Sequence, residues 1–355
     1  MRAATNSLLR LQPGVGPLQS EAITLTTGWN FIVLPGLSGA LSAHEACAQI
    51  ATQGGAAIEI NRWDAEANNW AAHVCGLPFG DFCMTPGKGY FVKAAADGVW
   101  TPQGSATCSA AAASSAVSGS VVAAAGQPVI SAVRIANVRD GSFAVSWLTD
   151  RSATGYVRFG ADPDALVNVA YDDRGAGTIG RTHHVTLRGL QPETTCYVAL
   201  VSGETASGDL YRVTTGPTLG IPAAHTAYGR ILQADGVTPA AGALVYLALY
   251  DRDGRDTPGQ ADVLSALTDE NGYWAVNLGA ARSKYGDAYF VYGADDGLAI
   301  ETRQGSAIQA GQVVAVNQAA PAPALRLAGG VKAYLPLVTE REGDRRAVAQ
   351  PDDER

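Results

Sequence analysis

The sequence has few charged residues, an excess of negative charge and no long apolar run, and each shortage excludes a class of protein. Charged residues make up 16% of the 355 positions, and the net charge is −8 at pH 7. A nucleic acid would meet a surface whose mean field repels it, so we expect no nucleic-acid partner. No apolar run approaches the roughly 18 residues that a membrane helix needs, so we expect no membrane span.

Catalytic motifs are also missing. None of the five histidines lies in an HExxH or His-x-His pattern, no GxSxG elbow occurs, and "PGKG" at 86–89 lacks the first glycine of a phosphate loop. His183 and His184 are neighbours on an expected strand, so one should be half-buried and the other exposed, and they cannot share a metal ion. We therefore predict that the protein is not an enzyme and requires no cofactor.

Cysteine is scarce and odd in number. The five cysteines form no CxxC pair, which argues against a zinc or redox motif. Cys75 and Cys83 flank a stretch whose Gly and Pro could fold the chain back, which predicts one disulfide between them. For the other three cysteines, buried and inert thiols are as good an interpretation as further disulfides.

Turn residues and short strands are abundant. The chain has 41 glycines and 17 prolines, and runs rich in Val, Thr and Tyr recur between them. This pattern predicts a mainly β protein with a small mixed module followed by two immunoglobulin-like sandwiches. The expected segments are an N-terminal arm (1–20), a β-rich module (21–104), an Ala/Ser-rich linker (105–126), two sandwich domains (127–218 and 219–328) and a C-terminal strand with a polar tail (329–355).

Residues 21–104 contain one expected helix after Ser42. Ser42 and Glu45 form a capping box, and Ala43, Cys47 and Ile50 share one face. The strand "GWN" running into "LP", a tryptophan hairpin and "PGKGYFV" resemble a module of bacterial secreted and surface proteins. The resemblance implies a location outside the cytoplasm and brings no activity. The arm before it has no apolar stretch of signal-peptide length, so the signal was removed, the start is incomplete, or export follows another route.

Residues 127–218 show alternating strands, such as Phe143, Val145 and Trp147. "VSWLTD" and "LQPETTCYV" resemble the core-tryptophan strand and the corner of a fibronectin type III domain, of the kind that also precedes some secreted phosphatases. Cys196 occupies the usual position of the corner tyrosine, so we expect packing to hold this corner.

Residues 219–328 contain "YGRILQADGVTPAAGALVYL" and "LTDENGYWAVNL", which resemble the carboxypeptidase regulatory-like (transthyretin-like) sandwich. After a proline-rich spacer follows "KAYLPLV", and such a run recurs near the C-terminus of bacterial exported proteins that carry both sandwich types. The last seventeen residues are too charged to fold alone.

Two stretches are candidate binding sites. Trp63 and Trp70 flank the turn "DAEANN" and, with Tyr90 or Trp100, could form a flat platform for sugar rings; the alternative is that they cap the module's core. "DRDGRDTPGQAD" offers four carboxylates for calcium, although it lacks EF-hand spacing and its two arginines could neutralise it as a plain polar loop. These carboxylates belong to Asp251, Asp253, Asp256 and Asp262.

The sequence thus predicts a non-enzymatic extracellular structural or adhesive protein, with self-association into a surface filament or layer as one form. The arm or the "KAYLPLV" run would add a strand to a neighbour's sheet. The alternative is a polysaccharide-binding accessory protein of a secreted hydrolase system.

Overall fold

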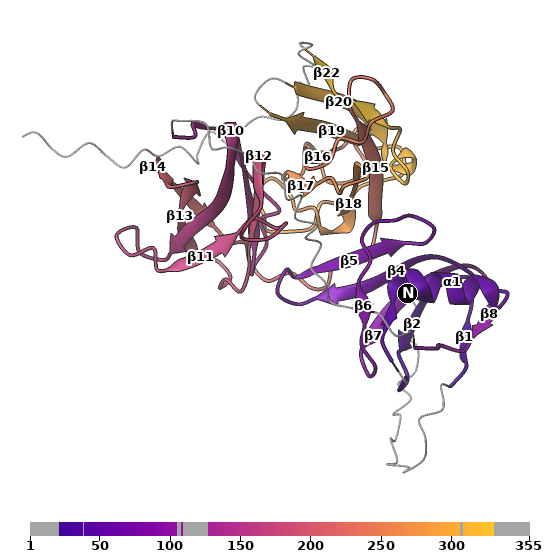
Figure 1. The fold of residues 1–355 in the computed structure, drawn as a ribbon. Helices are drawn as coiled ribbons and strands as arrows, with labels where there is room; N and C mark the ends of the chain where they lie inside the picture. Colours follow the sequence, from indigo (N-terminus) through magenta and orange to yellow (C-terminus); the bar gives the residue numbers. More distant parts are fainter. Residues whose placement is uncertain (1–20, 38, 105–107, 109–126, 306–307, 330–355) are drawn as a thin grey trace, which may run out of the picture.

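The computed structural model describes residues 21–37, 39–104, 108, 127–305 and 308–329, and in these residues the chain is mainly β, as predicted. Figure 1 shows three groups of sheets, which we call modules 1, 2 and 3 in chain order. The N-terminal arm, nearly all of the predicted linker and the C-terminal run lie outside the described residues. No helix in the described part is long and apolar enough to cross a membrane.

Module 1 is built on a four-stranded antiparallel sheet in the order β2-β7-β4-β5, with α1 packed beside it. Two short ladders, β1 with β8 and β3 with β6, close the module. The bounds are β1 (Ile23–Leu25), β2 (Gly28–Val33), β3 (Leu41–Ser42), α1 (Ala43–Thr52), β4 (Ala56–Asp64), β5 (Asn69–Val74), β6 (Cys83–Met84), β7 (Gly89–Ala96) and β8 (Gly98–Trp100).

The capping box of α1 is confirmed. The Ser42 hydroxyl accepts a hydrogen bond from the Glu45 amide at 3.1 Å, and the Glu45 carboxylate accepts one from the Ser42 amide at 3.0 Å. Together they satisfy two amide donors that the first helical turn cannot satisfy itself. Ala43, Cys47 and Ile50 are buried in the module core, also as predicted.

The predicted Cys75–Cys83 disulfide is wrong. Cys75 follows β5 and bonds to Cys47 of α1, whereas Cys83 lies on β6 and bonds to Cys108. The turn between Cys75 and Cys83 does fold back, but the fold of the module brings another cysteine closer to each. Spacing along the chain carries no information about such long-range neighbours.

Module 2 is organised by one long strand, β10 (Phe143–Gly160). Its first half pairs with β9 (Ile130–Ala136) and β12 (Ile179–Leu187), and its second half pairs with β11 (Asn168–Tyr171) and β13 (Thr195–Ser202). The register shifts between Leu148 and Ala153, and such an irregularity bends a strand. The bend lets β10 pair with strands in both halves of the sandwich. β14 (Thr205–Thr214) pairs with β13 at the far edge.

The corner of module 2 is held by more than the expected packing. Cys196 is packed in the core as expected, and hydrogen bonds also hold the corner. The buried Thr215 hydroxyl donates to the Gln191 carbonyl at 2.6 Å and accepts from the Thr194 amide at 2.9 Å. A threonine from the next segment therefore supplies the hydrogen bonds that a corner tyrosine would make.

Module 3 contains a three-stranded sheet in the order β18-β15-β21 and a five-stranded sheet in the order β17-β16-β19-β20-β22. Trp274, Val276 and Leu278 are buried between them, as their alternation predicts. The strands are β15 (Thr226–Leu232), β16 (Leu244–Tyr250), β17 (Leu264–Leu267), β18 (Tyr273–Asn277), β19 (Gly297–Gln304), β20 (Ile308–Ala315), β21 (Leu325–Arg326) and β22 (Ala328–Gly329).

Modules 2 and 3 share a buried interface. Val245 and Leu247 of β16 face the core of module 3, while Tyr246 points the other way and is only 1% exposed, in a cluster with Leu148 of β10. The Tyr246 hydroxyl hydrogen-bonds Ser146 at 2.8 Å. Both faces of β16 are therefore buried.

Polar groups complete this interface. Arg134 forms two 3.1 Å hydrogen bonds to Glu301 and lies over the Tyr246 ring at 4.5 Å. His184 contacts the Ser265 hydroxyl at 2.9 Å and Asp173 at 2.7 Å. The expectation that one histidine of the pair is exposed is wrong, because both are buried. Module 3 covers His184, and His183, on the other face of the strand, stacks on Trp147.

Asp172 links three segments of module 2. Its buried carboxylate accepts hydrogen bonds from Arg174 Nε at 2.8 Å and Nη2 at 2.9 Å, and His183 Nδ1 lies 3.6 Å away. Burial alone would raise the pKa of Asp172, but the hydrogen bonds and the charge of Arg174, with the His183 ring close by, together hold the pKa well below its usual value of 3.8. The ionised form is therefore favoured by the fold.

Replacing Cys47 and Cys75 together by serine removes a link between residues 28 positions apart. We expect a loss of about 3 kcal/mol in the free energy of unfolding, because the unfolded chain gains the entropy of an open loop. Urea unfolding measures the loss. The pairing is checked by mass spectrometry of unreduced protein cleaved before Asp81, which separates Cys75 from Cys83. A peptide pair joined through Cys75 and Cys83 would contradict the structure.

The Asp172 carboxylate makes stability depend on pH. Because its pKa is lower in the folded protein than in the unfolded chain, its stabilisation is complete above about pH 5 and is lost as the pH falls further. We expect Asp172→Asn to lower stability at pH 6 and to flatten the fall in stability between pH 5 and pH 2, measured by urea unfolding. Asp164→Asn, at an exposed carboxylate in the same module, is the control. Equal pH slopes for both variants would contradict the role of Asp172.

Candidate functional site

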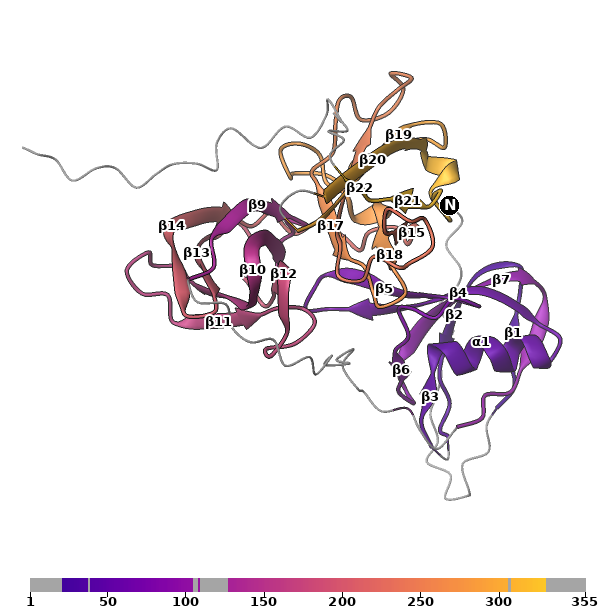
Figure 2. The ribbon, with the colours of Figure 1, turned by 45° about the horizontal axis from the view of Figure 1, so that its top comes forward.

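The β4–β5 hairpin of module 1 reaches into the junction of all three modules (Figure 2), where β5 lies beside β18. The Trp70 indole donates to the Pro222 carbonyl at 2.9 Å, and Asn277 of β18 donates to Asn69 at 3.1 Å. On the side of module 2, Arg188 pairs with Asp64 at 3.1 Å. The hairpin is thus held by contacts on both sides.

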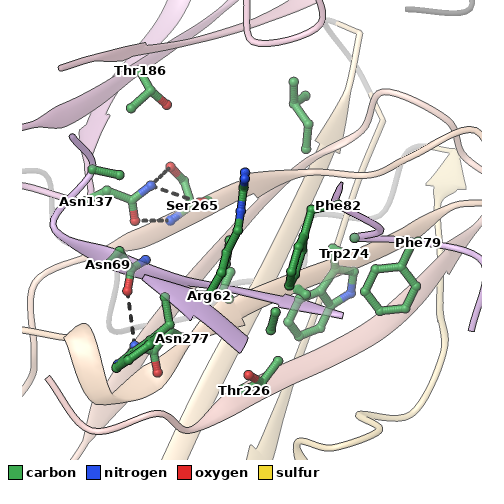
Figure 3. A pocket seen from close by; sticks show the side chains of 18 of the residues that line it. Arg62, Asn69, Phe79, Phe82, Asn137, Thr186, Thr226, Ser265, Trp274 and Asn277 are labelled. Atoms are coloured by element: carbon green, nitrogen blue, oxygen red, sulfur yellow. Dashed lines mark hydrogen bonds between the residues drawn. The ribbon is translucent and has the colours of Figure 1, made fainter. Parts of the chain in front are cut away.

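A cavity of about 470 Å³ lies at this junction, within the size range of roughly 300–1,000 Å³ that ligand sites occupy. Every module contributes to its wall, and Figure 3 shows side chains that point into it. Aromatic residues in the wall are Trp70, Phe79, Phe82, Tyr273 and Trp274, and charged ones are Arg62, Asp81, Arg139, Arg188 and Asp269.

The aromatic side of the cavity joins modules 1 and 3. Phe79 stacks on Tyr273 with ring centroids 5.2 Å apart and an interplanar angle of 14°. The Arg62 guanidinium lies 5.0 Å from the Phe82 ring centroid, and Figure 3 shows these two side chains next to each other. Such stacking keeps the planar guanidinium in one orientation while leaving its N–H edge free.

The charged groups of the cavity differ in how far they are already paired. Asp81 accepts hydrogen bonds from the amides of His44 and Phe82, both at 2.9 Å. Asp269 accepts from the amides of Asn271 and Tyr273, and burial raises its pKa. In each carboxylate the Oδ1 atom accepts both hydrogen bonds, and these neutral donors do not cancel the negative charge.

Among the described residues, two arginines of the cavity form no ion pair with a carboxylate. In the described part of the chain no carboxylate forms an ion pair with Arg62. Arg139 is 4% exposed and donates to the Ala280 carbonyl at 3.2 Å. Burial and the neighbouring charge of Arg282 lower the pKa of Arg139 to about 10, so it still carries its charge at neutral pH.

The flat platform predicted from Trp63 and Trp70 does not form. The two residues are cross-strand partners, but their rings meet edge to face at 69° with centroids 5.1 Å apart. Tyr90 and Trp100 are buried in the module core and cannot extend a platform. Trp70 instead lines the cavity, a position that depends on module 3 and that no pattern within the hairpin indicates.

The predicted calcium loop, residues 251–262, connects β16 to β17 as expected, but its four aspartates do not converge. The structure brings Asp251 and Asp253 together with the buried Asp296, with one carboxylate oxygen of each within 4.8 Å of the others. Asp256 is not in this group, and Asp262 instead binds through its amide to the Arg282 carbonyl. Asp296 belongs to the acidic pair in "GADDG" (293–297), a signal in the sequence that points to it as a further carboxylate ligand.

This acidic cluster has internal partners. Asp251 accepts from the amides of Asp253 and Gly254, and Asp296 accepts from the amides of Arg252 and Gly293. Arg255 lies 3.7 Å from Asp253. One of the two loop arginines therefore offsets the charge of a loop carboxylate, as the sequence allowed. Calcium binding stays a prediction, now with a different set of three carboxylates.

Comparison with known proteins gives one family match, within module 2. Residues 130–215 match the family model of the purple acid phosphatase N-terminal domain. This stretch includes the fibronectin-like strands and excludes modules 1 and 3. No curated protein matches the chain.

Solved structures give only distant likenesses. A structure of PhoD is 12% identical with a TM-score of 0.21, and the match covers 29% of this chain and 22% of that one. The FN1–FN3 domains of chicken CNTN1 are 11% identical with a TM-score of 0.22 and coverages of 57% and 68%. BcpA, the major pilin subunit of Bacillus cereus, is 12% identical with a TM-score of 0.18 and coverages of 82% and 99%. TM-scores this low do not indicate a shared function.

Calcium should raise the melting temperature if the cluster binds it. At a free concentration of about 100 times Kd the stabilisation is about 2.7 kcal/mol, and Asp296→Asn should abolish the difference between calcium and chelator. Differential scanning calorimetry measures both. Asp256→Asn, in the same loop but outside the cluster, should keep the full shift. A shift that Asp256→Asn removes and Asp296→Asn leaves unchanged would place the ion elsewhere.

Proposed function

We propose that the protein is a non-catalytic structural component outside the cytoplasm that associates with further copies of itself through the free edge of module 1. The observation that carries this proposal is strand β2. It is the outer strand of the four-stranded sheet and, among the described residues, has β7 as its one ladder partner. The opposite edge, β5, is covered by module 3.

The side chains of β2 are unusual for a free edge. Trp29, Phe31 and Val33 point outward with 39%, 63% and 55% of their surface exposed, and Phe31 contacts Phe91 of β7 at 5.1 Å. Natural edge strands are usually protected by charge, proline or a bulge, because unpaired backbone groups recruit other strands. An apolar, unprotected edge favours an added strand as its partner.

The chain itself offers a suitable strand. Residues 332–338, "KAYLPLV", are apolar and follow module 3. As a strand donated to β2 of a second copy, this run would cover the exposed side chains and pair the free backbone groups. The donor run follows module 3 and the acceptor strand belongs to module 1. Each copy can therefore donate one strand and accept another at the same time, which produces an open chain of subunits.

The location outside the cytoplasm is supported by cysteine chemistry. The structure pairs four of the five cysteines in two disulfides within module 1. Disulfides persist in oxidising compartments and are rare in the cytosol. The fibronectin-like module, with its family match to an accessory domain, fits a role in spacing and support.

Assembly is tested by electron microscopy and sedimentation velocity of the purified chain. We expect polymers from the full chain, and none after deletion of residues 330–355 or after Phe31→Lys, because a charge on the strip blocks the apolar contact. Val167→Lys, at an exposed apolar residue of module 2, is the matched control and should assemble normally. Polymers that persist without residues 330–355, or a full chain that stays monomeric at all concentrations, would refute the proposal.

A further inference from the structure

We propose that the cavity at the junction of the modules is a binding site for an acidic saccharide, with the carboxylate of a uronic acid bound at Arg62 and its ring packed on the aromatic side. This site is separate from the β2 edge and independent of self-association. In Figure 3 the rings of Phe79, Phe82 and Trp274 lie to one side of Arg62, and Asn69, Asn137 and Ser265 lie to the other.

The first argument is charge. Three guanidinium groups and two carboxylates line the cavity, in a protein whose net charge is −8. Arg188 is paired with Asp64, whereas one oxygen of each carboxylate accepts hydrogen bonds from neutral backbone amides. The two carboxylates keep their charge and offset that of the two remaining arginines, so it is Arg62, without a carboxylate partner among the described residues, that favours an anion.

The second argument is geometry at Arg62. Its guanidinium is stacked over Phe82, so its orientation is set before any ligand arrives. A planar guanidinium edge matches the two oxygens of a carboxylate and gives paired, charge-assisted hydrogen bonds. Because Arg62 is exposed at the cavity, an anion reaches it without first breaking an ion pair.

The third argument is the remaining wall. Sugar rings have one apolar face that packs on aromatic side chains and hydroxyl groups that need polar partners. The Phe79–Tyr273 stack supplies the apolar surface. Asn69 accepts from Asn277 through its amide oxygen, which leaves its amide N–H groups to donate to a hydroxyl. A small inorganic anion would use the arginines and leave the rest of this wall unused.

The test uses the full chain and three defined probes: trigalacturonic acid, neutral cellotriose and inorganic phosphate. Isothermal titration calorimetry gives the affinities, and Trp70 in the wall provides a fluorescence signal. We expect saturable binding of trigalacturonic acid, with cellotriose and phosphate each at least tenfold weaker. Arg62→Ala should weaken trigalacturonic acid at least tenfold, and Arg62→Lys should restore only part of the loss because lysine lacks the planar edge.

Controls separate this site from general charge effects. Arg158→Ala removes an exposed arginine of module 2 and should leave the affinity unchanged. Melting temperatures show whether the Arg62 variants keep their fold. Absence of saturable binding, equal binding of cellotriose, equal binding of phosphate, or an Arg62→Ala variant that binds like Arg158→Ala would each overturn the proposal.

Discussion

The contact between modules 2 and 3 is the constraint on which the rest of the structure depends. Tyr246 is buried between two sandwiches, its hydroxyl satisfied by Ser146 and its ring covered by Arg134. A buried hydroxyl and a buried ion pair are costly unless every partner is in place, so this interface permits one arrangement of the two modules. That arrangement creates the recess into which the β4–β5 hairpin of module 1 fits, and with it the cavity.

The site is consequently a property of the whole chain. Arg62 and Phe82 come from module 1, Arg139 and Arg188 from module 2, and Tyr273 from module 3. None of these residues forms a motif with its neighbours in sequence. A chain that needs three modules to build one cavity also couples them, because a ligand that touches all three favours the assembled arrangement over a separated one.

Local patterns in the sequence predicted local structure well. The Ser42–Glu45 capping box, the tryptophan hairpin and the alternation in β10 and β18 are short-range signals, and the structure confirms them. The platform failed because the rings of the cross-strand pair Trp63 and Trp70 meet edge to face, whereas two other failed predictions, namely the Cys75 partner and the burial of His184, depended on neighbours far along the chain. Asp296 shows the same limit, since it joins Asp251 only after β19 has paired with β16.

The two disulfides of module 1 have a mechanical meaning. They join residues 28 and 25 positions apart, and between them they enclose most of the chain from α1 to the end of the module. If the protein is pulled from its ends, the enclosed segments cannot lengthen, because the force passes through the sulfur bridges rather than through the β-ladders. Module 1 can then yield only in the strands outside the bridges, among them β2, so its unbridged edge is the part that stretches first.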